Sequence, residues 1–240
     1  GFDNILFTPN GNVHRILTKL AFQNLLHPFQ PFIIGQRIIG PLMALKFNIP
    51  LIFYGENQAE YGNAIKENDK PEMDESFFTT SNINEIVLSG EPLVKIIKDH
   101  KFKVNDFKPY IPPEIREIKQ AKIEQRYLGY YLPWDPQECF YYASKHTGFK
   151  PNTERTEGSY SKYSSIDDKI DPYHYFCTYI KFGIGRATYD TSQEVRNNKI
   201  DRNEGVKLVK KYDSEFPKKY FKEFLKYIDH DEKKFWQTID

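Results

Sequence analysis

The stretch NIPLIFYGENQAEYGN, residues 48–63, decides the expected fold. A continuous apolar run of strand length ends there in a glycine turn, which is typical of a strand buried on both faces of a parallel sheet. The segments before it are expected to alternate: residues 3–9 (DNILFTP) as a strand, 10–26 as an amphipathic helix, and 31–49 as an apolar helix kinked at Gly40-Pro41. This alternation predicts an α/β domain over residues 1–68 with a parallel sheet.

The composition of the chain changes after residues 65–74 (IKENDKPEMD), a charged segment that contains a proline. We interpret them as a hinge, followed by a mainly helical lobe over residues 69–240. Asp201 is expected to cap one helix, and Pro217 to lie near the first turn of another. The expected helices are 90–100, 112–123, 136–146, 204–213 and 216–228, with a strand at 126–134.

Composition excludes several classes of protein. Of the 240 residues, 39% are hydrophobic and 16% aromatic, so the chain has enough apolar material for a core. The formal net charge of +1 supplies no field for nonspecific binding to nucleic acid, and no apolar run is long enough to span a membrane. Two cysteines without CxxC spacing, Cys139 and Cys177, indicate a reducing compartment, so we expect a cytoplasmic protein. Because the net charge is close to zero, we expect no nucleic-acid partner.

The first candidate site follows the apolar strand. Ligands of parallel sheets collect beyond the carboxyl ends of the strands, where Gly55 permits close backbone approach and polar side chains follow it. A turn with a solvated helix start explains the same residues without a ligand. The candidate ligand-binding residues are Gly55, Glu56, Asn57 and Glu60.

The second candidate site lies in residues 155–176, where hydroxyls and carboxylates gather. The candidate ligand-binding residues of this segment are Glu157, Gly158, Ser159 and Tyr160, of which the two hydroxyls suit sugar oxygens. Asp167, Asp168 and Asp171 have the spacing either of a helix first turn or of Mg²⁺ ligands. The first interpretation is favoured because no DxDxDG pattern is present, and we predict no metal site formed by the chain itself.

The third candidate is the stretch KFGIGRATYD, residues 181–190. A Gly-x-Gly turn exposes backbone N–H groups, and a lysine and an arginine flank it, which together suit a phosphate or another anion. The alternative is a helix C-cap in which Gly183 or Gly185 is left-handed. We favour anion binding, with the predicted residues Lys181, Gly183, Gly185 and Arg186.

Several long motifs occur in one order along the chain. They are TPNGNVHRILTKLAF, PFIIGQR, ALKFNIPLIFYGENQAEYGN, EGSYSKYSSIDDKID followed by YHYF, KFGIGRATYDTSQEVRN and EGVKLVKKYD. Through them nearly the whole chain resembles the N-acetyl sugar amidotransferases of bacterial surface-polysaccharide biosynthesis, which belong to the PP-loop ATP pyrophosphatases. The resemblance implies the C-terminal part of a Rossmann-like PP-loop sheet, of the adenine nucleotide alpha hydrolase-like type, followed by a helical lobe.

The resemblance also implies a reaction. ATP, with Mg²⁺, would adenylylate the acetamido oxygen of a nucleotide-linked sugar, and ammonia from a glutaminase/cyclase-like partner would then give an acetamidino group. Gly55, Glu56, Asn57 and Glu60 would face ATP, and the segments Glu157–Tyr160 and Lys181–Arg186 would face the sugar. The SGGxDS motif of the family is missing from these residues, and the chain opens on GFDNILF without an initiator methionine. We therefore expect a fragment whose PP-loop lies upstream.

Two other functions stay open. A tRNA-thiolating PP-loop enzyme would place cysteines before the second loop, where this chain has FIIGQRI. A noncatalytic module that docks a glutaminase partner would need neither ATP nor a sugar.

Overall fold

The computed structural model describes residues 2–55 and 70–240, except for the side chain of Ile83. Two compact units divide the chain. The first unit comprises Gly1–Ile52, Asp74–Glu124 and Tyr227–Asp229, and the second comprises Phe53–Met73, Gln125–Lys226 and His230–Asp240. The boundary expected between residues 68 and 69 stays a prediction.

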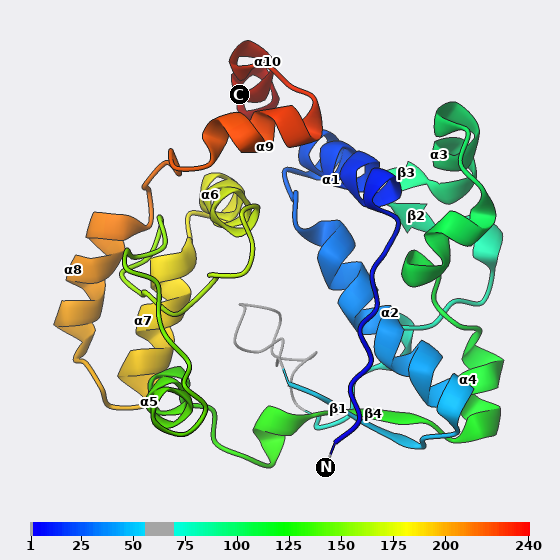
Figure 1. Ribbon diagram of the computed structural model, residues 1–240, viewed down its shortest axis with the longest axis horizontal. Helices are drawn as coiled ribbons and strands as arrows, with labels where there is room; N and C mark the ends of the chain where they lie inside the picture. Colours follow the sequence, from blue (N-terminus) through cyan, green and yellow to red (C-terminus); the bar gives the residue numbers. More distant parts are fainter. Residues whose placement is uncertain (1, 56–69) are drawn as a thin grey trace. The chain divides into compact units, whose positions relative to one another are not determined.

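The first unit is built on two N-terminal helices, α1 (Gly11–Leu25) and α2 (Gln30–Phe47), which pack together (Figure 1). The Asn10 side chain accepts hydrogen bonds from the N–H groups of Asn12 and Val13, which fixes the start of α1. Pro41 lies inside α2 and removes one backbone donor there. Both expected N-terminal helices are therefore confirmed.

The other elements of the first unit complete a small core. They are β2 (Val87–Leu88), β3 (Glu91–Pro92), α3 (Leu93–His100) and α4 (Ile115–Ala121), with 3₁₀ turns at Glu75–Phe77, Ile83–Glu85 and Val104–Tyr110. Strands β2 and β3 form an antiparallel hairpin whose turn residues, Ser89 and Gly90, both have positive φ. The side chains of Val13, Leu17 and Phe107 are almost fully buried in this core.

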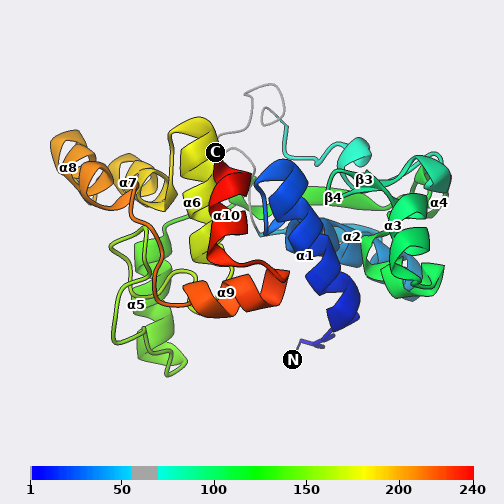
Figure 2. The same ribbon diagram turned by 90° about the horizontal axis from the view of Figure 1, so that it is seen from above.

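The second unit is mainly helical. Its helices are α5 (Pro136–His146), α6 (Asp171–Phe182), α7 (Arg186–Arg196), α8 (Arg202–Tyr212), α9 (Phe221–Ile228, whose last residues fall in the first unit) and α10 (Glu232–Ile239), with a 3₁₀ turn at Leu128–Tyr130. Helices α7 and α8 lie side by side in both views (Figures 1 and 2). Asp201 caps α8, as expected, by accepting a hydrogen bond from the N–H of Glu204.

Aromatic rings form much of the core of the second unit. The rings of Tyr173 on α6 and Phe224 on α9 stack with centroids 4.1 Å apart, and Phe235 on α10 is fully buried. Phe216 and Phe221 pack edge to face, with centroids 4.9 Å apart. These contacts fix α6 against the C-terminal helices, and α6 in turn leads directly into α7.

The sheets are smaller than expected. Strand β1 (Leu51–Tyr54) pairs with β4 (Glu124–Tyr127) in a small parallel sheet, and with the β2–β3 hairpin this makes two two-stranded sheets in the described part of the chain. The chain is thus α/β with a mainly helical lobe, but this part of it contains no extended Rossmann-like sheet.

Three predictions about strands are wrong. Residues 3–9 form no strand, because in the described ranges they have no partner strand to satisfy their backbone groups. Strand β1 is not buried on both faces: the side chains of Leu51 and Phe53 are exposed, and among the described residues only β4 pairs with it. The strand expected at 126–134 ends at Tyr127, because a 3₁₀ turn with Gly129 follows.

Candidate functional site

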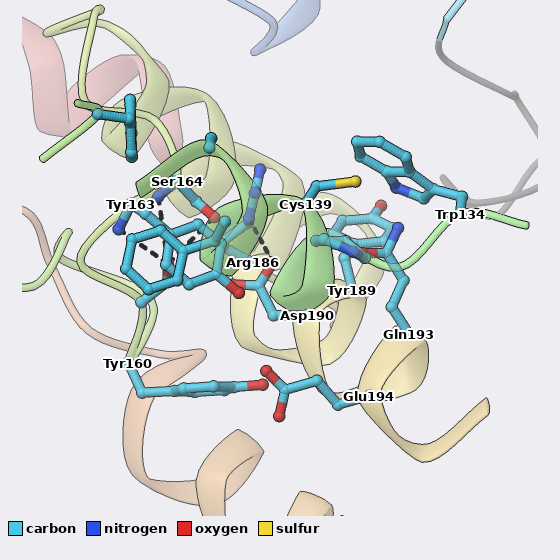
Figure 3. Close-up of a pocket in the computed structure, with 15 residues that line it drawn as sticks. Trp134, Cys139, Tyr160, Tyr163, Ser164, Arg186, Tyr189, Asp190, Gln193 and Glu194 are labelled. Atoms are coloured by element: carbon cyan, nitrogen blue, oxygen red, sulfur yellow. Dashed lines mark hydrogen bonds and ion pairs between the residues drawn. The ribbon is translucent and has the colours of Figure 1, made fainter. Parts of the chain in front are cut away.

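A cavity of about 320 Å³ lies within the second unit (Figure 3). Its walls come from α5, from α7 and from the loop between residues 156 and 165. The α7 wall consists of Arg186, Tyr189, Asp190, Gln193 and Glu194. Their spacing of three and four residues places all five on one face of the helix.

The α5 wall repeats this spacing with apolar groups. Pro136, Cys139, Phe140 and Ala143 face the cavity, together with Trp134, which precedes the helix, and Phe149, which follows it. Asp135 caps α5 by accepting a hydrogen bond from the N–H of Glu138. The polar atoms therefore come mainly from α7 and the loop, and the apolar surface comes mainly from α5.

The loop is held by its own serines and threonine. The Ser161 hydroxyl accepts hydrogen bonds from the N–H groups of Tyr163 and Ser164, each at 3.2 Å. The Thr156 hydroxyl donates to the Ser164 carbonyl at 2.8 Å. These local bonds position Tyr160, Ser161, Tyr163 and Ser164 on the cavity wall.

The Tyr163 ring is fixed from two sides. It stacks on Phe140 of α5 with centroids 4.5 Å apart and planes 8° apart, and its hydroxyl donates to Gln137 at 2.9 Å. Burial, together with the nearby carboxylates of Glu194 and Asp190, raises the pKa of Tyr163 to about 12. Tyr163 is thus a neutral, rigid part of the wall at physiological pH.

An arginine and two carboxylates supply the charge of the cavity wall. Arg186 Nε lies 2.8 Å from Asp190 Oδ1, and both side chains are largely buried. The Ser159 hydroxyl donates to the other Asp190 oxygen, and Arg186 Nη1 donates to the Tyr175 hydroxyl. This chain of contacts pairs Arg186 with Asp190 and leaves Glu194 as the second acidic group.

Glu194 faces Tyr160 across the cavity, where the Tyr160 hydroxyl points toward its carboxylate (Figure 3). Burial raises the pKa of Glu194, the Tyr160 hydrogen bond lowers it, and the charge of Asp190 raises it again. Burial also raises the pKa of Tyr160. Glu194 makes no ion pair with any residue in the part of the chain that the structure describes.

The turn between α6 and α7 binds an anion from the chain itself, the carboxylate of Asp213. The nearly buried carboxylate of Asp213 accepts from Gly185 N at 2.9 Å, Thr188 N at 3.0 Å and Thr188 Oγ1 at 2.5 Å. Gly183 is the left-handed C-cap of α6 at φ 71°, whereas Gly185 is extended at φ −117°. A Cβ on Gly185 would lie 2.9 Å from Asp213 atoms, so glycine is needed there for close approach.

The residues predicted from the sequence divide into three groups. Tyr160 and Arg186 line the cavity, and Ser159 lies behind it against Asp190. Glu157 accepts from the N–H groups of Lys218 and Lys219, and Gly158 donates to Glu215. Lys181 and Gly183 are exposed and do not line the cavity, and Gly185 contacts Asp213 instead.

The predicted nucleotide-side residues are mostly outside the described ranges. Glu56, Asn57 and Glu60 lie outside the described residues, and Gly55 is described but does not line the cavity. Asp168 accepts from the N–H groups of Ile170 and Asp171, so one aspartate of the DDKID segment serves the start of α6. This contact agrees with the favoured helix-turn interpretation of that segment.

The sequence analysis missed most of the α7 wall. Tyr189, Asp190, Gln193 and Glu194 follow Arg186 at helical spacing, a polar and aromatic stripe in RATYDTSQE. That stripe could have indicated the cavity, but the Gly-x-Gly turn before it indicated a site only at the start of the helix.

The described chain shows no helix with the length and apolarity needed to cross a membrane. A search of curated proteins gave no significant match. Residues 157–240 match the family described as LPS biosynthesis protein WbpG-like, C-terminal domain. Through these residues the chain is similar to WbpG-like proteins of LPS biosynthesis, which supports the resemblance of its motifs to a family of surface-polysaccharide biosynthesis.

Proposed function

We propose that the chain works in an ATP-dependent amidotransferase of surface-polysaccharide biosynthesis, and that the cavity between α5, α7 and the 156–165 loop binds its acetamido sugar. The observation that carries the proposal is an overlap. The region similar to the WbpG-like C-terminal domain begins at residue 157, and both the loop wall and the entire α7 wall lie inside it.

The lining of the cavity suits a sugar. Aromatic rings provide flat apolar surfaces on which the C–H faces of a pyranose can lie, and Trp134 and Tyr189 are two such rings. Gln193 offers both an amide donor and an acceptor, and Ser161 and Ser164 add hydroxyls. A volume of 320 Å³ is near the lower end of small-molecule sites, about 300–1,000 Å³, which suits one sugar ring.

ATP and Mg²⁺ enter the proposal through the family resemblance. Of the four residues expected beside ATP the structure describes only Gly55, which alone is no phosphate site, so we derive no step through the nucleotide. When bound, ATP would make the amide oxygen a leaving group. Ammonia from a glutaminase/cyclase-like partner would supply the new nitrogen, in the cytoplasm, where nucleotide-linked sugars are made.

The test is AMP release by the full-length protein, measured with an N-acetyl sugar nucleotide, ATP and ammonium. Gln193→Ala should lower kcat/KM about tenfold, since removing a hydrogen-bonding partner of substrate costs roughly 1–1.5 kcal/mol. Ser192→Ala is the matched control, because Ser192 is the exposed neighbour of Gln193 on α7 and bonds only the Thr188 carbonyl in the structure.

Unchanged turnover in Gln193→Ala would remove the cavity from the reaction. AMP release that does not depend on the sugar would overturn the amidotransferase assignment. If full-length protein bound neither sugar nor ATP, a scaffold for the glutaminase partner would become the better account.

A further inference from the structure

The charge of the cavity wall is unbalanced. Three side chains that line it are charged: Arg186, Asp190 and Glu194. Arg186 and Asp190 form an ion pair with both side chains largely buried, so their charges cancel locally. The remaining charge is the Glu194 carboxylate, one turn along α7 from Asp190.

Among the described residues, no cationic side chain forms an ion pair with Glu194. Its charged and titratable neighbours are Tyr160 in the loop, Asp190 on α7, Glu204 on α8 and Asp135 before α5. The nearest lysine in sequence, Lys199, is already bonded to Glu138 and Asp135. Two or more like charges at a partly buried site raise the free energy of the empty cavity, and a cationic ligand would relieve this cost.

Aromatic faces surround the same space. Trp134, Phe140, Tyr160, Tyr163 and Tyr189 all line the cavity, and Figure 3 shows the Tyr160 hydroxyl next to the Glu194 carboxylate. The ring faces carry negative electrostatic potential, so a set of rings with an acidic group is the usual recognition site for organic cations. The faces of the same rings would repel a phosphate or a carboxylate.

Resting on the proposed function, we infer that the cavity recognises a positively charged nitrogen on the sugar, so that it binds the amidinium form more tightly than the neutral acetamido form. Glu194 accepts a charge-assisted hydrogen bond from the amidinium N–H, and the surrounding rings stabilise the rest of the cation. In the proposed reaction the amidinium would form as the nitrogen of ammonia bonds to the acetamido carbon and the adenylylated oxygen leaves with AMP, and the same carboxylate would stabilise the positive charge that develops.

The test compares two ligands of nearly the same shape. Calorimetry with this chain should show that the acetamidino analogue of N-acetylglucosamine methyl glycoside binds about tenfold more tightly than the acetamido compound. In Glu194→Gln, which keeps the size of the side chain but removes its charge, the ratio should fall toward one. Glu204→Gln is the control, because Glu204 is exposed on α8 and does not line the cavity, and it should keep the ratio.

Equal affinity of the two compounds for the unmodified chain would overturn cation recognition and leave the sugar site in place. A ratio that survives in Glu194→Gln would also overturn it, because another group would then supply the selectivity. Binding of neither compound would overturn both the inference and the sugar site. The comparison on the unmodified chain needs no variant to fold.

Discussion

Two carboxylates near the cavity show how one residue type takes different roles. Asp213 is buried and accepts three hydrogen bonds, so its charge is stabilised by backbone and hydroxyl donors. Asp171 is buried too, but burial raises its pKa from 3.8 to about 6, while the Ser165 hydrogen bond lowers it. The two sites differ in their donors: Asp213 accepts three hydrogen bonds, whereas Asp171 Oδ1 is buried without a hydrogen-bond partner among the described residues.

Asp171 should therefore make stability depend on pH. Because its folded-state pKa is raised, the folded state binds the proton more tightly, and this contribution is present below pH 4 and is lost as pH rises through about 6. Asp171→Asn should gain stability relative to the original chain across that window, by about 3 kcal/mol. Urea unfolding at pH 4 and pH 7.5 measures it.

The matched control for that prediction is Asp167→Asn, since Asp167 is exposed. Its variant should follow the pH dependence of the original chain. If Asp171→Asn also followed it, the Asp171 carboxyl would be ionised at low pH in the folded state, contrary to the account.

Glu194 predicts a pH dependence for ligand binding. Burial raises its pKa, and a cationic ligand needs the ionised carboxylate, so affinity for the acetamidino compound should fall as pH decreases through that raised pKa. Calorimetry from pH 7.5 down to pH 4.5 should show this fall in the original chain. Glu194→Gln should show a flat profile, and an equally steep fall in that variant would place the titrating group elsewhere.

At the scale of elements, the start of α7 depends on a residue that is distant in sequence. Asp213 follows α8, yet it satisfies the N–H groups of Gly185 and Thr188 at the first turn of α7. Arg155 and Glu215 hold the neighbouring loop in the same way: the guanidinium meets both carboxylate oxygens at 2.6 and 2.5 Å, and Glu215 also accepts from Gly158 N. The segment 213–215 therefore positions two walls of the cavity.

Asp213→Ala should destabilise the chain by about 2–4 kcal/mol, because it leaves buried donors at a helix start without an acceptor. Asp213→Asn keeps one acceptor oxygen, so its free energy of unfolding should fall by about half as much. Thermal unfolding of the two variants beside the original chain measures the difference. Equal, small losses below about 0.5 kcal/mol would show that Asp213 does not hold the start of α7.

The two glycines of the turn should respond differently to alanine. Gly183→Ala should lower the free energy of unfolding by about 1 kcal/mol, because alanine is strained in the left-handed conformation of this residue. The loss stays small because nothing lies within 4 Å of an added Cβ. Gly185→Ala should cost more, roughly 2 kcal/mol or above, because its Cβ would meet Asp213 atoms at 2.9 Å. The reverse order in urea unfolding would contradict this description of the turn.

Sequence periodicity predicted the elements whose stability is mainly local. The helices α1, α2, α5 and α8 appear where apolar spacing and caps placed them. The strand expected at 3–9 failed because a strand needs a partner, and pairing is not visible in a local pattern. For the same reason, the role of Gly185 was predicted only in part. The Gly-x-Gly pattern indicated that its N–H group binds an anion, but the anion is the carboxylate of Asp213, which lies 28 residues away in the sequence.

At the scale of the whole molecule, the cavity belongs to one unit. All of its lining residues fall in the second unit, and its loop and α7 walls fall in the region similar to WbpG-like C-terminal domains. The sequence indicated two of its residues, Tyr160 and Arg186, by their chemistry. It could not indicate Trp134 or Phe140, because an aromatic residue on a helix looks the same in sequence whether it faces a core or a cavity.

The most direct test of the account follows the backbone amide signals of this chain by NMR during titration with N-acetylglucosamine methyl glycoside. The account predicts saturable shifts that are confined to residues 134–149, 156–165 and 186–194, and their loss in Tyr189→Ala, which removes one ring of the wall. Shifts that map elsewhere in the chain, or no saturable shifts at all, would contradict the claim that this cavity is the sugar site.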